Sequence, residues 1–430
     1  MEAPRYSCAL GGALSTALGI YGTVPILHSG AGCGQAHLNG QSYGCGENAG
    51  GPQGGTSTPC SCLVEEHAIF GGEDKLRNLI QSSIELMDGD LYSVISGCVP
   101  ALIGDDVDSV VKEFKDKATI VHVKTAGFVG NSYDGYELFF EAIIDQLLTP
   151  LPKIKGRVNI FGIVPYQHLF WKGDLLVLKK TLEKVGIEAN IIFREFNGLN
   201  NLKEIPAAEL NLVFSTWNGH SIAKKLEEKF GTPYLFFPGV PIGPKQSSKL
   251  LLQLAKRLNL PLEVTEKVIE EEERIAYRFL EYLGDVHILG FPHPYFAVIA
   301  DSGTAIGITQ FLANVMGYLP EIVIVTDSPP DEHRAEIVRE LTEGIESIVK
   351  PDVIFESDSH LIRLKLRDRS FLALLASSLE KYIAPELGAA VHLSVSFPSF
   401  DRLILERSYA GYVGGLTLME DIMSQIVSPL

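Results

Sequence analysis

The sequence has no hydrophobic run of membrane-spanning length. Its longest apolar runs, such as LNLVFSTW, fall well short of the ~20 residues that a transmembrane helix needs. The chain also does not open with a basic segment followed by an apolar one, which is the pattern of a secretion signal. We therefore expect no membrane partner and a cytoplasmic location.

Basic residues are scarce relative to acidic ones. The chain has 36 Lys and Arg against 53 Asp and Glu, which gives a formal net charge of -17. Such a surface repels nucleic-acid phosphates and anionic lipid headgroups. We therefore expect no nucleic-acid partner.

Two catalytic signatures are missing as well. No GxxxxGK[ST] loop is present, so the chain has no visible site for ATP hydrolysis. The eleven histidines include no HExxH motif or other ligand spacing. We assign no catalytic residue to this chain.

What the chain does contain is alternating strand and helix patterns over 430 residues, enough for about three domains. Nine short apolar segments read as buried strands: 91–97, 119–125, 158–164, 189–193, 210–216, 233–237, 295–301, 321–327 and 352–358. Amphipathic stretches between them read as crossover helices, and 261–283 reads as a long acidic helix. The pattern predicts an α/β fold of three Rossmann-like domains with doubly wound parallel sheets.

Two Pro-rich segments, near 149–157 and 290–295, suggest where the domains meet. We predict an N-terminal α/β domain at 1–150, a middle α/β domain at 151–290 and a C-terminal α/β domain at 291–430.

All six cysteines lie in the first 98 residues: Cys8, Cys33, Cys45, Cys60, Cys62 and Cys98. Independent placement would rarely cluster them so strongly, which favours a shared role. A disulfide framework is the alternative, but it is typical of small secreted domains. The clustering therefore favours binding of a metal or a metal cluster.

Three of these cysteines are placed to converge. Cys98 follows a predicted strand, Cys33 follows the apolar stretch TVPILHSGAG, and Cys8 precedes a run of small residues that could start a helix. Loops after parallel strands gather at one sheet edge, where ligands bind. Glycines beside the cysteines, Gly32 and Gly97, would let the backbone approach a bulky inorganic group.

Three thiolates are one ligand short of a complete four-cysteine site. Either the site is open, or a second chain completes it. Zinc is disfavoured, because structural zinc sites usually use close CxxC pairs. The roles of Cys45, Cys60 and Cys62 stay open, as does that of the Gly-rich segment 30–59, which is either a functional loop ordered by a partner or a surface insertion.

Three polar residues near these cysteines have simpler interpretations. Asp105 and Asp106 stand before a predicted helix, where carboxylates cap free N–H groups. His28 lies beside the predicted site and is either a hydrogen-bonded structural histidine or a proton relay.

Five motifs in succession, PRYSCALGGAL, VPILHSGAGCG, EEHAIFGGEDKL, ISGCVPALIGDDVDSV and AGFVGNSYDGY, resemble the N-terminal domain of nitrogenase component 1 subunits. The resemblance implies that Cys8, Cys33 and Cys98 are one subunit's half of the ligands of a P-cluster type iron–sulfur centre, [8Fe-7S]. It also implies that an α-type partner supplies the other half in an α2β2-like assembly. A separate ATP-dependent iron–sulfur reductase component would deliver the electrons.

The resemblance is closer to β-type than to α-type subunits. Ser215 stands where α-type chains carry the cysteine that anchors the active-site cofactor, and the C-terminal segment SFPSFDRLILERSYAGYVGGLTLMEDIM lacks the cofactor histidine of α-type chains. Asn131, in the loop GFVGNSYDGY, stands where nitrogenase has a serine near the cluster. The middle domain should therefore hold no cofactor, and side chains such as Trp217 and Phe237 should fill the space.

Cys45, Cys60 and Cys62 in an enlarged Gly-rich loop make the chain look more like the nitrogenase-like reductases than like true nitrogenase. The resemblance implies an electron-relay subunit for reduction of a small substrate in the partner, with carbon–sulfur bonds, as in methylthio-alkane reductase, as the favoured target. The alternatives are a scaffold for metallocofactor assembly, a tetrapyrrole-reductase subunit and a true nitrogenase β subunit.

Overall fold

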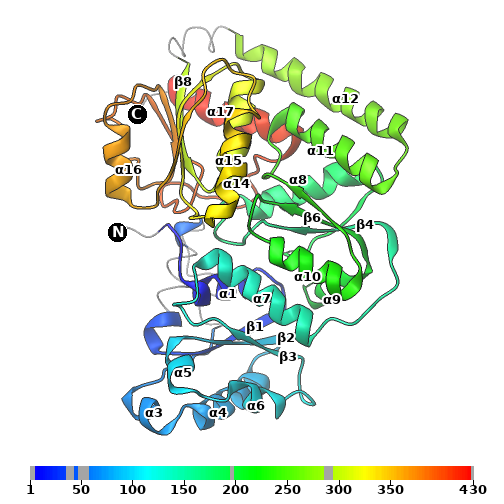
Figure 1. Ribbon diagram of the computed structural model, residues 1–430, viewed down its shortest axis with the longest axis vertical. Coiled ribbons are helices and arrows are strands. Elements are labelled where there is room, and N and C mark those ends of the chain that lie inside the picture. The colour runs from blue at the N-terminus through cyan, green and yellow to red at the C-terminus, as the bar shows by residue number, and fades with distance from the viewer. Residues whose placement is uncertain (1–4, 35–42, 47–57, 194–197, 285–293, 428–430) are drawn as a thin grey trace.

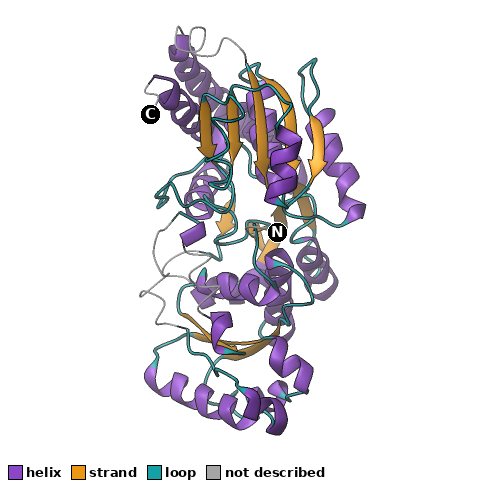
Figure 2. Cartoon of the chain, turned by 90° about the vertical axis from the view of Figure 1, so that its left-hand side faces the viewer, coloured by secondary structure: helices purple, strands orange, loops and turns teal. Residues whose placement is uncertain are grey.

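The computed structural model describes residues 5–34, 43–46, 58–193, 198–284 and 294–427. These residues form three separate sheets, and every strand pair within them is parallel. The three-stranded and five-stranded sheets lie at opposite ends of the molecule (Figures 1 and 2). The predicted α/β fold with Rossmann-like units is confirmed. The domain boundaries stay predictions, and the Pro-rich segment near 290 falls mostly outside the described residues.

The N-terminal sheet has the strand order β1-β2-β3, formed by Thr23–His28, Leu91–Ser96 and Ile120–Lys124. Apolar side chains alternate along these strands, so each face of the sheet carries its own core. Helices α1 and α7 cover one face, and α4 and α6 cover the other (Figure 1). The helices of this unit are α1 (Ala9–Leu18), α3 (Glu65–Phe70), α4 (Glu73–Leu86), α5 (Cys98–Ile103), α6 (Val107–Lys112) and α7 (Ser132–Gln146).

The middle sheet has the order β5-β4-β6-β7. Its strands are β4 (Ile154–Phe161), β5 (Glu188–Asn190), β6 (Ala208–Phe214) and β7 (Tyr234–Phe237). Its helices are α8 (Trp171–Glu183), α9 (Gly198–Lys203), η2 (Ile205–Ala207), α10 (His220–Phe230), α11 (Gly243–Leu258), α12 (Leu262–Leu280) and η3 (Glu281–Leu283). The acidic helix expected from the sequence is therefore present as α12, with mostly exposed side chains.

The C-terminal sheet has the order β10-β9-β8-β11-β12, so the strand order reverses at β8, as in a doubly wound sheet. Its strands are β8 (Tyr295–Ala300), β9 (Leu319–Val325), β10 (Asp352–Phe355), β11 (Ala373–Ala376) and β12 (Val391–Ser394). Its helices are α14 (Ser302–Asn314), α15 (Asp331–Thr342), α16 (Ser359–Leu366) and α17 (Gly411–Val427). Helix α17 also packs on α11 of the middle unit.

Two glycines let α1 and α7 pack backbone against backbone. A Cβ added at Gly12 would lie 2.0 Å from the carbonyl oxygen of Ser132, and one added at Gly135 would lie 2.1 Å from that of Ala9. Any larger residue would push the helices apart. This close packing holds the N-termini of the two helices side by side, and Cys8 and Asn131 stand at those termini.

Glu137 joins α7 to the middle unit. Its carboxylate accepts hydrogen bonds from the Gly219 N–H at 2.5 Å and from the Ser221 hydroxyl, at the start of α10. Burial raises the pKa of Glu137 to about 7.

This raised pKa predicts a pH dependence of stability. The folded protein holds a proton on Glu137 that the unfolded chain loses near pH 4.5, so the contribution is complete below that pH and is lost as the pH rises through about 7. We expect urea unfolding to show that the free energy of unfolding of the wild type falls between pH 4.5 and about 7. This fall should exceed that of the Glu137→Gln variant by up to about 3 kcal/mol. Equal slopes for the two proteins would contradict the assignment.

Among the described residues, we find no helix whose length and apolar character would let it cross a membrane.

Candidate functional site

Two of the three predicted ligand cysteines meet at one backbone position. Cys8 is the residue before α1, and Cys98 is the first residue of α5, directly after β2 and Gly97. Gly127 follows β3, and a Cβ added there would lie 3.1 Å from the Cys98 sulfur and 3.2 Å from the Cys8 sulfur. The Gly127 N–H donates to the Cys98 sulfur at 3.0 Å. Both thiols therefore face the same glycine.

Asn131 adjoins Cys8 through the backbone. The two residues form an antiparallel bridge, and the Ala9 N–H donates to the Gly130 carbonyl at 3.0 Å. The Asn131 side chain accepts from the Tyr133 N–H at 2.9 Å and so caps α7. Its amide oxygen is thus engaged in the helix cap, while its backbone fixes the position of Cys8.

Cys33 lies in the helical segment 31–34 after β1, where its N–H donates to the Gly30 carbonyl at 3.2 Å. Its thiol interacts electrostatically with that of Cys60. A Cβ at Gly32 would meet no atom within 4 Å among the described residues, so none of them demands glycine there. A Cβ at Gly97, in contrast, would lie 2.5 Å from the Ser29 hydroxyl, so the segment leading to Cys98 requires a glycine.

Within the part of the chain that the structure describes, no group of three or more His, Cys, Asp or Glu side chains is close enough to hold a metal ion. The structure thus brings Cys8 and Cys98 together. The ligand set Cys8, Cys33 and Cys98 stays a prediction. The surroundings of the first pair nevertheless suit a bulky sulfur-rich group, because a thiol donor set meets a glycine backbone and an N–H donor.

Cys60 and Cys62 lie on a short extended segment beside β1. The Leu27 N–H donates to the Pro59 carbonyl, and the Ser61 N–H donates to the Leu27 carbonyl, both at 2.8 Å. Burial raises the pKa of the Cys60 thiol to about 11, whereas Cys62 is exposed. Much of the Gly-rich segment around them, residues 35–42 and 47–57, lies outside the described residues.

His28 is a structural histidine. Its Nδ1 lies 3.1 Å from the Ser61 hydroxyl and its Nε2 lies 3.0 Å from an Asp105 carboxylate oxygen. All three side chains are almost fully buried, so no substrate can reach the serine. Burial lowers the pKa of His28, although the Asp105 hydrogen bond opposes that shift. The network fixes the backbone around β1.

Of the two acidic residues after α5 that were predicted to cap the next helix, only Asp106 does so. Asp106 does cap α6, because its side chain accepts from the Ser109 N–H at 3.0 Å. Asp105 instead accepts from the Gly72 N–H at 3.0 Å and holds His28. The cap interpretation was therefore wrong for Asp105, which turns toward the buried histidine.

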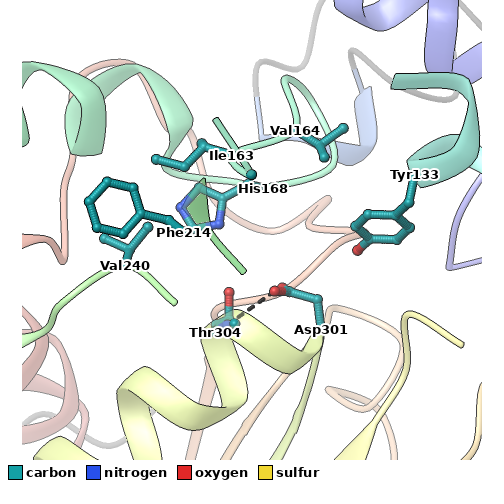
Figure 3. Close-up of a pocket in the computed structure, with 10 residues that line it drawn as sticks. Tyr133, Ile163, Val164, His168, Phe214, Val240, Asp301 and Thr304 are labelled. Atoms are coloured by element: carbon teal, nitrogen blue, oxygen red, sulfur yellow. Dashed lines mark hydrogen bonds between the residues drawn. The ribbon is translucent and has the colours of Figure 1, made fainter. Parts of the chain in front are cut away.

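A second candidate is a cavity of about 30 Å³ between the three units, lined by Tyr133, His168, Asp301 and Thr304 among others (Figure 3). It offers room for about two water molecules. Nearby, Trp217 and Phe237 are buried, and the indole N–H of Trp217 donates to Asp327 at 2.9 Å. Burial raises the pKa of Asp327 to about 6.

Ser215 stabilises the turn after β6. Its buried hydroxyl oxygen accepts from the backbone N–H groups of Trp217, at 3.2 Å, and Asn218, at 3.0 Å.

Replacing Ser215 by Ala should leave two buried N–H groups without an acceptor and lower the free energy of unfolding by about 1–2 kcal/mol. Metal content and turnover should stay nearly unchanged. Urea unfolding and iron analysis test this, with Ser424→Ala on an exposed face of α17 as the control. Loss of metal or activity from a folded Ser215→Ala protein would contradict it.

Comparison with known proteins places the fold and the cysteines in context. Residues 8–427 match the family described as nitrogenase component 1 type oxidoreductase. The chain is 23% identical to the nitrogenase molybdenum-iron protein beta chain of Methanococcus maripaludis, over 99% of this chain and 94% of that one. It is 27% identical to the nitrogenase iron-molybdenum cofactor biosynthesis protein NifE of Clostridium pasteurianum, over 86% of this chain and 76% of that one. A solved structure of nitrogenase Cp1 at pH 6.5 shares the fold, with a TM-score of 0.79 and 22% identity over 99% of this chain and 93% of that one.

Proposed function

Because this chain belongs to the nitrogenase component 1 type oxidoreductase family, as a β-type subunit, we propose that it serves as the electron-relay subunit of a nitrogenase-like reductase. In this proposal Cys8, Cys33 and Cys98 hold one half of a P-cluster type [8Fe-7S] centre, and an α-type partner holds the other half. The convergence of Cys8 and Cys98 on Gly127 is the observation that carries it.

The chain's own residues supply the setting for such a centre. Cys8 and Cys98 would provide thiolates, and the Gly127 N–H would donate to a ligand sulfur, an interaction that tunes reduction potential. When bound, the centre would accept and pass on electrons.

Partners follow from the same proposal. The relatives include beta and alpha chains of nitrogenase molybdenum-iron proteins, which supports an α-type subunit as the partner in an α2β2-like assembly. Since the chain contains no P-loop, a separate ATP-dependent iron–sulfur reductase would supply electrons. The substrate would be reduced in the α-type partner, and carbon–sulfur bond cleavage is the first activity to test.

The similarity to NifE favours one alternative, a scaffold on which a metallocofactor is assembled. Co-expression with the α-type subunit separates the two functions. We expect a purified heteromer with iron, sulfide and the paramagnetic resonance signal of an oxidised cluster, and turnover of an organic sulfide, dinitrogen or a tetrapyrrole when reductase and ATP are added. A heteromer that never turns over, but transfers its metal centre to a second protein, would identify the scaffold instead.

A further inference from the structure

A second group of thiols, Cys60 and Cys62, lies beside β1. Cys60 and Cys62 flank Ser61 on the segment that runs beside β1. The Cys62 N–H also donates to the Cys60 sulfur at 3.4 Å. None of the six cysteines is in a disulfide in this structure.

The backbone that carries this pair is held in place from both sides. Ladder hydrogen bonds attach Ser61 and Leu63 to β1 and the turn that follows it. The Ser61 side chain between the two cysteines is buried against His28 and accepts from the Ser29 N–H at 3.0 Å. Residues two apart in an extended segment have Cα atoms about 6.6 Å apart, which lies inside the range that a disulfide can bridge.

Cys62 also has an unusual backbone. Its φ of 48° lies in the left-handed region, which residues other than glycine seldom adopt. Strain of this kind persists where the surrounding structure imposes it, and it is common at functional positions. The Lys75 ammonium donates to the Cys62 carbonyl at 2.9 Å and helps hold that conformation.

We propose that Cys60 and Cys62 are a redox-active dithiol that closes reversibly to a disulfide by exchange with a small-molecule disulfide. The exposed Cys62 thiolate attacks the small disulfide, forms a mixed disulfide and releases one small thiol. Cys60 then attacks the Cys62 sulfur, forms the Cys60–Cys62 bond and releases the second small thiol. Two electrons and two protons pass from the protein to the small molecule.

The exposure of Cys62 and the small ring that a Cys60–Cys62 disulfide would close explain why this bond would be reversible. A strained or exposed disulfide is more easily reduced than a buried structural one, and this property characterises regulatory pairs. Formation of the Cys60–Cys62 disulfide would change the segment that contacts β1 and lies beside Cys33. The oxidation state of this pair would therefore affect the surroundings of the predicted cluster ligand.

The sequence allows the redox state of Cys60 and Cys62 to be measured on a single peptide. Glu-C digestion after Glu47 and Glu65 yields the peptide 48–65, whose only cysteines are Cys60 and Cys62. We would incubate the purified chain or its complex anaerobically in glutathione buffers of increasing oxidised fraction, trap thiols with N-ethylmaleimide and measure the peptide by mass spectrometry. The expected product in oxidised glutathione carries no maleimide and is about 2 Da lighter than the dithiol. Dithiothreitol added before the trap should restore two maleimides.

Matched variants give the attacking order. Cys60→Ser should trap a glutathione adduct on Cys62, and Cys62→Ser should react much more slowly, because its remaining thiol is half-buried. In the purified chain, the neighbouring peptide 3–47, which contains Cys8, Cys33 and Cys45, should keep three maleimides under mild oxidation. Two maleimides on 48–65 at every glutathione ratio would overturn the proposal, and so would a disulfide joining that peptide to Cys33.

Discussion

Replacing Cys98 by Ala is expected to strip most of the iron from the complex with the α-type partner. A methyl group cannot replace a thiolate ligand, and even loss of an outer-shell partner typically lowers metal affinity roughly 10–100-fold. Cys98 is also the thiol that accepts the hydrogen bond from the Gly127 N–H. Cys33→Ala should have the same effect if the proposed ligand set is right.

Iron and sulfide analysis of the purified heteromer, with paramagnetic resonance of the oxidised sample, measures the loss. The matched control is Cys62→Ser, at an exposed cysteine outside the proposed ligand set, which should retain much more iron. Circular dichroism establishes that each variant is folded. Unchanged iron in Cys98→Ala together with lost iron in Cys62→Ser would show that the ligands were assigned to the wrong thiols.

The fold could be predicted largely because its strands are buried on both faces. All nine predicted segments overlap a strand of the structure. The three strands that were not predicted are β1, β11 and β12. β1 contains Pro25, which weakens a strand pattern, and β11 and β12 have only four residues each. Their strand structure depends on pairing with neighbours that the local sequence does not reveal.

The sequence predicted the site only where the ends of strands determine the positions of its residues. The rule that loops gather at one sheet edge places Cys8 and Cys98 together, as the structure does. It does not identify Gly127, because that contact depends on how the loop after β3 folds across α1 and α5. A glycine in AGFVG directly after a predicted strand was the available signal. The same local reasoning misplaced Asp105, whose partner His28 is distant in sequence.

A buried ion pair between Arg5 and the distant Glu380 holds the segment that leads to Cys8. Arg5 and Glu380 are each at most 2% exposed, and the Arg5 Nη2 lies 2.5 Å from the Glu380 carboxylate. Arg5 also donates to the Ser377 hydroxyl at 3.2 Å and to the Ser357 carbonyl at 3.3 Å. The N-terminal segment is thereby attached to the C-terminal unit three residues before a predicted cluster ligand.

Arg5→Met should therefore lower the free energy of unfolding by about 3–5 kcal/mol, because it leaves the Glu380 carboxylate buried without its cation. The double variant Arg5→Met with Glu380→Leu should recover much of that loss, since a buried ion pair often contributes little more than an apolar pair of similar volume. Urea unfolding of the heteromer gives the double-mutant cycle. Arg77→Met, which breaks a partly exposed surface pair with Glu113, is the control and should change stability little.

Measuring the iron content distinguishes two roles of Arg5: positioning the segment that carries Cys8, and stabilising the fold. If Arg5 positions Cys8, the double variant should regain stability and still bind less iron than wild type, because methionine and leucine do not reproduce the directed hydrogen bonds to Ser377 and Ser357. Full iron in the double variant would mean that Arg5 stabilises the fold without positioning Cys8. Wild-type stability in Arg5→Met alone would contradict the buried pair itself.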